Sequence, residues 1–286
     1  MGPVSGDHCG VRITTDDGVG LAVEVTGEGP GLLLVHGFGG AKEDFADHVA
    51  VLARDHTVVV FDHRGHGASD KPTKPTSYTL ERLVSDTLLV ADAAALDSFR
   101  LLGHSMGGMV ARKLVIRAPE RVEALVMMDT TAGPIPGFDA SLMEAASEVA
   151  LTRGKDALKE LLDIATDPLD NPAYQRLLVE RPGYQEFADR KWNDLSAVMW
   201  GAIVLEMAYQ SDDLAALAAA LRGPLLVLVG ELDTPLLMAS IPMAEAIDGA
   251  QLVIIPDAGH SPQFENADAW IDAVTRFLAS LPAPAR

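Results

Sequence analysis

The hydrophobic positions of this chain gather in six short runs rich in Leu, Val, Ile and Met, with helix-like segments between them. The runs are Leu32–Val35, Val58–Phe61, Phe99–Leu102, Leu125–Met128, Leu225–Val229 and Leu252–Ile255. A strand that is apolar at successive positions is buried on both faces, and helices that join such strands produce a parallel sheet. The pattern therefore predicts an α/β fold with a mostly parallel sheet.

The intervening segments predict helices, and the region ahead of the first run predicts a hairpin. Helices are expected at Phe45–Ala53, Thr79–Leu96, Met106–Ala118, Met238–Ile247 and Asp268–Leu281. The short segments Val11–Thr14 and Leu21–Thr26 flank the turn signal Asp16-Asp17-Gly18. Two extended segments around such a turn favour an antiparallel hairpin at the edge of the sheet.

The alternation of strands and helices stops between Thr131 and Leu214. That stretch has a helical pattern instead, which is interrupted by Pro134, Pro136, Pro168, Pro172 and Pro182. Because prolines end helices, several helices are expected here. We therefore expect a core made of 1–132 and 214–286, with a helical insertion at 133–213.

The charge of the chain excludes some classes of partner. Its 22 Lys and Arg residues against 41 Asp and Glu residues give a net charge of −19 with His neutral, and 48% of the residues are hydrophobic. Acidic surfaces repel phosphate backbones and anionic lipids, so nucleic acid and membrane surfaces are not expected as partners. The apolar fraction argues against disorder. Nothing in the pattern indicates an oligomeric state.

The single cysteine, Cys9, cannot form an intramolecular disulfide, which is compatible with a reducing compartment. It lies in the glycine-rich segment 1–10, which lacks the cationic start and the apolar run of a secretory signal. The longest apolar runs are of strand length, far short of the ~18 residues that a membrane span needs. A cytoplasmic protein is therefore expected.

The sequence Gly103-His104-Ser105-Met106-Gly107 follows one expected strand directly and opens an expected helix. Small residues at 103 and 107 allow a sharp strand-to-helix turn that exposes the hydroxyl of Ser105. This context distinguishes a nucleophile from a serine that merely caps a helix. We predict that Ser105 is the nucleophile.

A serine hydroxyl is a weak nucleophile near neutral pH and needs a general base, which in turn needs a partner that fixes its tautomer. Asp233 and His260 follow the last two expected strands, and the carboxyl ends of parallel strands lie at one edge of a sheet. We therefore expect Ser105, Asp233 and His260 to form a catalytic triad. Asp129, which ends the strand Leu125–Met128, is an alternative for the acid.

The glycine-rich sequence HGFGG, residues 36–40, follows the first expected core strand and reaches the same edge. Such turns leave backbone N–H groups unpaired, and these donors can bind a developing oxyanion. We expect the oxyanion hole to pair the N–H of Phe38 with that of Met106, the residue after the nucleophile.

These motifs resemble those of the α/β-hydrolase superfamily, and within it the cap-bearing esterases and related hydrolases. The similarity runs from Leu32 to about Leu281 and comprises HGFGG, FDHRGHGAS, GHSMGG, GELDTP and AGHSPQFEN, in the family's order. The resemblance implies a mostly parallel eight-stranded sheet with helices on both faces and a helical cap inserted after the sixth strand. The cap itself resembles nothing that indicates one substrate.

Asp62, His63 and His66 follow the second expected core strand and carry side chains of the kind that bind metals. In a hydrolase loop with this Arg-Gly-His-Gly pattern, however, these residues usually have a structural role, and Arg64 holds the turn. We therefore expect no metal site.

Large apolar side chains of the insertion are suited to line a substrate pocket. We expect Trp192, Met199, Trp200 and Tyr209 to contribute to it. At helical spacing the same residues could instead form the insertion's own core, and the sequence leaves this alternative open.

Together these residues predict a serine hydrolase that cleaves a small or medium, fairly apolar carboxylic ester or lactone through an acyl-enzyme on Ser105. No cofactor is expected, and the expected partner is the small-molecule substrate. Alternatives with the same triad are a perhydrolase and a carbon–carbon bond hydrolase; the latter often has Asn before the serine and Trp after the histidine, where this chain has His104 and Ser261. A different class is a ligand receptor on the same fold with slow turnover.

Overall fold

The computed structural model of the chain describes residues 9–164 and 170–282, and of Cys9 it describes the backbone alone. The expectations for the first eight residues, for Pro168 and for the last four residues therefore lie outside the described residues. None of the described helices is both long enough and apolar enough to cross a membrane.

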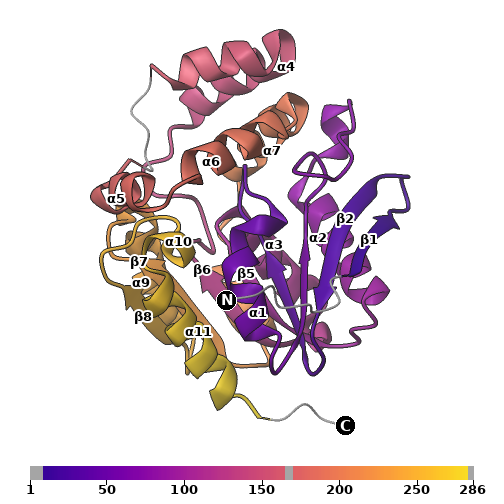
Figure 1. Ribbon diagram of the computed structural model, residues 1–286, viewed down its shortest axis with the longest axis vertical. Helices are drawn as coiled ribbons and strands as arrows, with labels where there is room; N and C mark the ends of the chain where they lie inside the picture. Colours follow the sequence, from indigo (N-terminus) through magenta and orange to yellow (C-terminus); the bar gives the residue numbers. More distant parts are fainter. Residues whose placement is uncertain (1–8, 165–169, 283–286) are drawn as a thin grey trace.

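In the described part of the chain, eight strands form one sheet in the order β1-β2-β4-β3-β5-β6-β7-β8 (Figure 1). The strands are β1 (Cys9–Thr14), β2 (Gly20–Thr26), β3 (Gly31–Val35), β4 (Thr57–Phe61), β5 (Phe99–His104), β6 (Val122–Met128), β7 (Leu225–Gly230) and β8 (Gln251–Ile255). β1 and β2 form an antiparallel hairpin, β2 pairs antiparallel with β4, and all other neighbours are parallel. The predicted hairpin and the six predicted core strands are confirmed.

Helices cover both faces of the sheet, because successive side chains of each buried strand point to opposite sides. The helices of this core are η1 (Lys42–Phe45), α1 (Ala46–Leu52), η2 (Pro75–Ser77), α2 (Leu80–Ala93), α3 (Met106–Arg117), η3 (Pro119–Arg121), α9 (Thr234–Ala246), α10 (Pro262–Glu265) and α11 (Ala267–Ser280). Leu32 and Leu34 share a hydrophobic cluster with α1 and α11, whereas Leu33 and Val35 share another with α2 and α3. Figure 1 shows α1 and α11 in front of the sheet.

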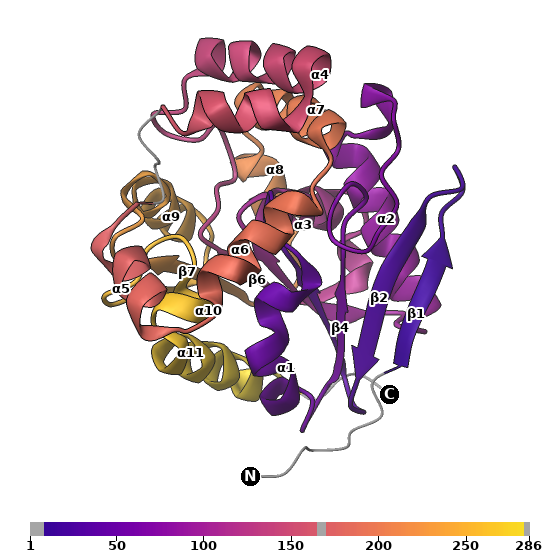
Figure 2. The same ribbon diagram turned by 45° about the horizontal axis from the view of Figure 1, so that its top comes forward.

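Further helices are inserted between β6 and β7. Those in the described residues are α4 (Ala140–Leu162), α5 (Pro172–Glu180), α6 (Tyr184–Asn193), α7 (Ala197–Ala208) and α8 (Leu214–Ala220). α4 and α7 pack against each other, and Ser147 Oγ donates a hydrogen bond to the Gly201 carbonyl at 2.7 Å. Figure 1 shows α4, α6 and α7 above the sheet, and Figure 2 shows α4 and α7 side by side. The predicted fold class, a mostly parallel eight-stranded sheet with an inserted helical cap, is confirmed.

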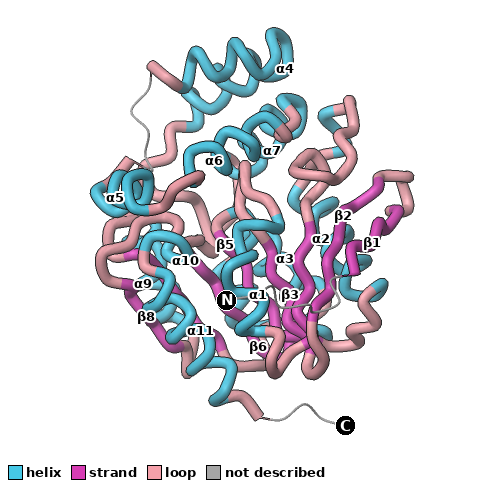
Figure 3. The backbone as a smooth tube through the Cα atoms, viewed as in Figure 1, coloured by secondary structure: helices cyan, strands magenta, loops and turns pink. Residues whose placement is uncertain are grey.

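The helix boundaries depart from the sequence-based expectation at particular residues. α9 begins at Thr234 rather than at Met238, because Pro235 is well suited to the first turn of a helix. α4 is interrupted at Gly154, whose φ of 81° lies outside the helical region. Figure 3 shows the loops that join the strands to the helices, and several of these loops carry the candidate site.

Candidate active site

Ser105 stands in a tight turn between β5 and α3. Its backbone has φ 54° and ψ −120°, which is a strained conformation for a residue with a side chain. The flanking glycines make the turn possible: a Cβ on Gly103 would lie 2.4 Å from the Gly107 carbonyl oxygen, and one on Gly107 would lie 2.2 Å from the Val35 carbonyl oxygen. The Ser105 N–H anchors the turn by donating to the Met128 carbonyl at 2.9 Å. The strand-turn-helix context that the sequence predicts for this serine is present.

Three side chains from three loops form a hydrogen-bonded chain. Ser105 follows β5, Asp233 lies just beyond β7, and His260 lies in the loop after β8. His260 Nε2 lies 3.0 Å from Ser105 Oγ, and His260 Nδ1 lies 2.6 Å from Asp233 Oδ2. Ser105 and Asp233 are each only 8% exposed, but Ser105 lines a cavity, whereas Asp233 is not part of its lining. The fold therefore brings these three residues together at one edge of the sheet.

The carboxylate of Asp233 determines which tautomer of the imidazole is present. Because a carboxylate accepts hydrogen bonds, Nδ1 of His260 carries the proton and Nε2 is left to accept one from Ser105. Burial by itself raises the pKa of Asp233, but the hydrogen bond and the charge of His260 outweigh burial, and the pKa is lowered overall. Asp233 is therefore ionised at neutral pH, as an orienting carboxylate must be.

Asp129, the alternative acid, lies beside Asp233, but none of the hydrogen bonds among the described residues joins it to His260. Its Oδ1 accepts the Gly230 N–H at 2.9 Å, and its Oδ2 has no hydrogen-bond partner among the described residues. The side chain is fully buried. Burial raises the pKa of Asp129 well above the usual value for a carboxylic acid, and the charge of Asp233 raises it further. Both effects favour the neutral form of Asp129, whose O–H can donate to Asp233.

The loop at 36–40 brings backbone donors to the nucleophile. A Cβ on Gly37 would lie 3.0 Å from the Cβ of Ser105, so the loop passes within contact distance of the serine. In the described part of the chain, the N–H groups of Phe38 and Met106 donate to no acceptor. Unpaired backbone N–H groups close to a serine are donors of the kind that can bind a developing oxyanion.

A cavity of about 300 Å³ opens beside Ser105 and is lined by both the core and the inserted helices. The aromatic side chains that line it are Phe38, Tyr174, Tyr184, Trp192 and Trp200. The rings of Phe38 and Trp200 are 5.6 Å apart between centroids, so the oxyanion loop and the insertion are in direct contact. Two of the four expected insertion residues, Trp192 and Trp200, therefore face this cavity.

Met199 and Tyr209 lie elsewhere. Met199 is fully buried against Gly65 of the core, where an added Cβ would lie 2.6 Å from the Met199 side chain. Tyr209 is 63% exposed, and its hydroxyl donates to Glu144. α7 packs against α4 as well as against the core, so an apolar residue on it can be buried without facing the cavity.

Two polar residues, His104 and Glu265, hold the loop of His260 in place. His104 Nε2 donates to the His260 carbonyl at 2.7 Å, and burial lowers the pKa of His104 to about 3, so this imidazole is neutral. Glu265 accepts the N–H of Gly259 at 2.6 Å and that of Ser261 at 3.2 Å. The backbone is thus fixed on both sides of His260. The only sequence signal for the role of Glu265 is the position of an acidic residue five places after His260.

Lys191 and Asp44 form an ion pair between the insertion and the core. Lys191 Nζ lies 2.7 Å from Asp44 Oδ1, and both residues line the cavity. Asp44 is only 3% exposed, and the ion pair supplies a partner for a carboxylate that is shielded from water. The sequence contains no signal for the pair, because 147 positions separate the two residues and their contact depends on how α6 packs.

The loop after β4 has a structural role. Both oxygens of Asp62 accept backbone N–H groups, from Lys42 at 2.8 Å and from Ala68 at 2.9 Å. Arg64 is fully buried and pairs with Asp86 at 2.6 Å. The carboxylate of Asp62 therefore stabilises the backbone around this loop, and the ion pair of Arg64 anchors the turn.

Another group of described residues has oxygen and nitrogen atoms close enough to share a cation. Ligand atoms of Asp129, Asp233 and His260 lie within 4.8 Å of one another. A cation there would replace the hydrogen bond between Asp233 and His260 and would require Asp129 to lose its proton. The arrangement fits proton transfer better than metal binding.

Several known proteins with similar sequences and structures are hydrolases. The chain matches the family model of the alpha/beta hydrolase fold over residues 30–267. It is 30% identical over 268 residues to a 2-hydroxymuconate semialdehyde hydrolase from Pseudomonas putida, which covers 90% of each chain.

Two solved structures share the whole architecture. An enol-lactonase from Burkholderia xenovorans LB400 aligns with a TM-score of 0.80 and 25% identity, over 94% of this chain and 100% of that chain. A thermophilic esterase from Thermogutta terrifontis aligns with a TM-score of 0.79 and 28% identity, over 95% of this chain and 98% of that chain. With its sheet order and its strand-end loops, and with a family match over most of its length, the chain belongs to the α/β-hydrolase fold family.

Proposed function

We propose that this chain is a serine hydrolase that cleaves a small or medium, fairly apolar carboxylic ester or lactone through an acyl-enzyme on Ser105. The observation that carries the proposal is the chain of hydrogen bonds from Ser105 through His260 to Asp233, at 3.0 Å and 2.6 Å. Nucleophilic catalysis needs a nucleophile within hydrogen-bond reach of a base that a third group orients.

In the proposed acylation step, His260 Nε2 takes the proton of Ser105 as Oγ attacks the substrate carbonyl carbon. Asp233 holds the imidazole in the required tautomer and stabilises its cation. The N–H groups of Phe38 and Met106 donate to the carbonyl oxygen as negative charge develops on it. His260 then protonates the departing alcohol, and water releases the acid from the serine by the same steps.

The cavity supports this class of substrate. Its volume of about 300 Å³ is at the lower end of the range for small-molecule sites. Trp192 and Trp200 favour an apolar acyl or alcohol group, and the similar structures include an enol-lactonase and an esterase. In this proposal the helices of 133–213 act as a cap that shapes access to a core of 1–132 and 214–286.

Kinetics on p-nitrophenyl esters of graded chain length, with lactones and an amide beside them, test the proposal. We expect turnover of short or medium acyl chains, and we expect a phosphonate inhibitor to add mass to the peptide that carries Ser105. Ser240→Ala is the matched control, because Ser240 is fully buried and its hydroxyl has no partner among the described residues. Labelling at another residue, or no turnover of any ester or lactone, contradicts the proposal.

Cleavage of a carbon–carbon bond is the second candidate. It is favoured by the 30% identity to a 2-hydroxymuconate semialdehyde hydrolase over 90% of the chain. Turnover of 2-hydroxymuconate semialdehyde by a preparation that leaves every ester and lactone intact would replace the first candidate with this one.

A further inference from the structure

The cavity beside Ser105 contains a hydroxyl that the proposed mechanism does not use. Tyr184, the first residue of α6, lines this cavity and is 5% exposed. Its hydroxyl has no hydrogen-bond partner among the described residues, yet it is not sealed inside the protein as the hydroxyl of Ser240 is. The O–H of a buried tyrosine usually has a partner, so a donor without one in a substrate cavity is available to a ligand.

The two tyrosines that lie outside this cavity have partners for their hydroxyls. Tyr78 is 1% exposed, and its hydroxyl donates to the Pro72 carbonyl at 2.7 Å. Tyr209 is exposed, and its hydroxyl donates to Glu144. The unpaired hydroxyl of Tyr184 is therefore a property of its position in the cavity.

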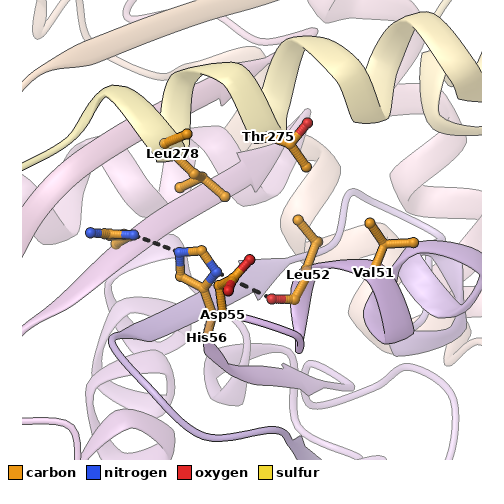
Figure 4. Close-up of a pocket in the computed structure, with 8 residues that line it drawn as sticks. Val51, Leu52, Asp55, His56, Thr275 and Leu278 are labelled. Carbon is orange, nitrogen blue, oxygen red and sulfur yellow. Dashed lines mark hydrogen bonds between the residues drawn. The ribbon is translucent and has the colours of Figure 1, made fainter.

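A second cavity, shown in Figure 4, differs in this respect. It lies at the start of β5, whereas Ser105 follows the end of the same strand. Figure 4 shows that both ring nitrogens of His56 in its wall have partners, which are the guanidinium of Arg100 and the Leu52 carbonyl. The protein itself satisfies this imidazole, as it does not satisfy the hydroxyl of Tyr184.

Neighbouring side chains hold the ring of Tyr184 in place. Its centroid lies 5.3 Å from that of Phe264 on α10 and 6.0 Å from that of Phe187 on α6. The guanidinium of Arg181 lies over the ring, 5.9 Å from its centroid. Because α6 belongs to the insertion and α10 to the core, the ring is packed where the two meet. A donor on a ring that is already packed loses little conformational entropy when a ligand binds.

The charges around this hydroxyl indicate which kind of ligand atom it binds. Burial raises the pKa of Tyr184, and the carboxylates of Asp44 and Glu265, which line the same cavity, raise it further. The phenol therefore keeps its proton at neutral pH and can donate a hydrogen bond. Lys191, which also lines the cavity, is already paired with Asp44 at 2.7 Å. Two carboxylates would repel an anionic group beside Tyr184, whereas they would not repel an uncharged oxygen.

We propose that the hydroxyl of Tyr184 selects substrates that carry a second, uncharged oxygen acceptor, such as an ether or ketone oxygen, in addition to the ester or lactone group. This proposal rests on the proposed function and narrows its substrate class. A hydrocarbon chain at the same place would bury the hydroxyl without a partner, which costs more than a hydrogen bond gains. Tyr184 is thus a specificity-determining residue that takes no part in the proposed proton transfers.

Three esters of equal size test the proposal in a pH-stat assay. Butyl butanoate is the reference, butyl methoxyacetate has an ether oxygen in place of a methylene of the acyl chain, and 2-methoxyethyl butanoate has one in the alcohol chain. All three suit a cavity of about 300 Å³, which has room for about ten heavy atoms at roughly 30 Å³ each. The measured quantity is the ratio of kcat/KM for each ether ester to that for butyl butanoate.

We expect Tyr184→Phe to lower this ratio by at least about fivefold for one of the two ether esters, because the variant removes the hydroxyl and keeps the ring. The comparison of ratios between wild type and variant cancels the inherent reactivity of each ester. Tyr209→Phe is the matched control, because it removes the same group from the insertion outside the cavity, and it should leave both ratios unchanged.

Failure of this proposal can be distinguished from failure of the proposed function. If butyl butanoate is hydrolysed but Tyr184→Phe lowers neither ratio by about fivefold, the role of Tyr184 is refuted and the proposed function stands. An equal fall in Tyr209→Phe would also refute that role, since the effect would not require a hydroxyl in the cavity. If the wild type hydrolyses none of the three esters, the proposed function is contradicted and the role of Tyr184 with it.

Discussion

The variants Asp129→Asn and Asp129→Ala distinguish the ability of this buried side chain to ionise from its hydrogen bonds, because Asn removes only the first and Ala removes both. Asn keeps an oxygen for the Gly230 N–H, which lies 2.9 Å from Asp129 Oδ1, and its amide can donate to Asp233 as a neutral acid does. Ala removes both interactions. We therefore expect Asp129→Asn to keep most of the activity and Asp129→Ala to lose a measurable part of it.

The size of the loss follows from the groups that Asp129→Ala leaves unpaired. A hydrogen bond to a charged group contributes about 1.5–3 kcal/mol, so loss of the donor to Asp233 should lower kcat/KM by roughly 10- to 150-fold. The buried Gly230 N–H also loses its acceptor, which should lower the free energy of unfolding by about 1–3 kcal/mol. Steady-state kinetics and urea unfolding of both variants measure these two quantities independently.

The pH dependence of stability gives the sign of the effect. Because the pKa of Asp129 is raised by burial and by Asp233, the folded protein keeps this proton above pH 4, where the unfolded chain loses it. The wild-type protein should therefore lose stability relative to Asp129→Asn as pH rises from about 4 through the folded-state pKa. If the wild type instead gains stability relative to Asp129→Asn over that range, Asp129 is ionised in the fold. If Asp129→Asn is inactive while Asp233→Asn is active, the catalytic acid is Asp129.

Four other outcomes are expected. Ser105→Ala should lower ester hydrolysis by about 10⁴-fold or more with an unchanged circular dichroism spectrum, and near wild-type turnover would remove Ser105 from the mechanism. Asp233→Asn should lower kcat by roughly 10⁴-fold because the imidazole loses its orienting carboxylate, and a loss of less than about tenfold would contradict that role. Trp192→Ala and Trp200→Ala should change the chain-length preference in ester kinetics while Ser105 is still labelled, and an unchanged preference would remove both from the pocket. Arg64→Met should lower the free energy of unfolding in urea by about 3–5 kcal/mol, since its buried carboxylate partner loses its counter-ion, and a variant as stable as the wild type would refute this.

The sequence predicted the sheet well because most strands from β3 to β7 are buried on both faces. β8 differs from the expectation, since it is an edge strand on which Leu252 and Ile254 are exposed. Runs such as Leu225–Val229 have no polar face, and this pattern is typical of the centre of a parallel sheet. The same rule located the candidate chemistry, since residues just beyond the carboxyl ends of parallel strands meet at one edge. Ser105, Asp233 and His260 could therefore be named together before any distance was known.

The insertion was harder to interpret because helical spacing does not say which neighbour a face packs against. Met199 and Trp200 are adjacent in sequence, yet one packs on Gly65 and the other lines the cavity. The ion pair of Lys191 with Asp44 depends on the placement of α6 over the core, which no local pattern encodes. The raised pKa of Asp129 is caused by burial and by a nearby charge, and both are properties of the fold.

The hydrogen bond from His104 to the His260 carbonyl links the proposed base to the proposed nucleophile through the backbone. His104 directly precedes Ser105, so a shift of the histidine loop must displace the end of β5. α5 of the insertion also holds this loop, because Arg176 donates to the carbonyls of Asp257 and Glu265, whereas none of the hydrogen bonds described above that position serine and histidine comes from Trp192 or Trp200. An engineer could therefore exchange side chains of α6 and α7 to accept new substrates without readjusting the alignment of serine and histidine. In such a scaffold, specificity and chemistry can be altered one at a time.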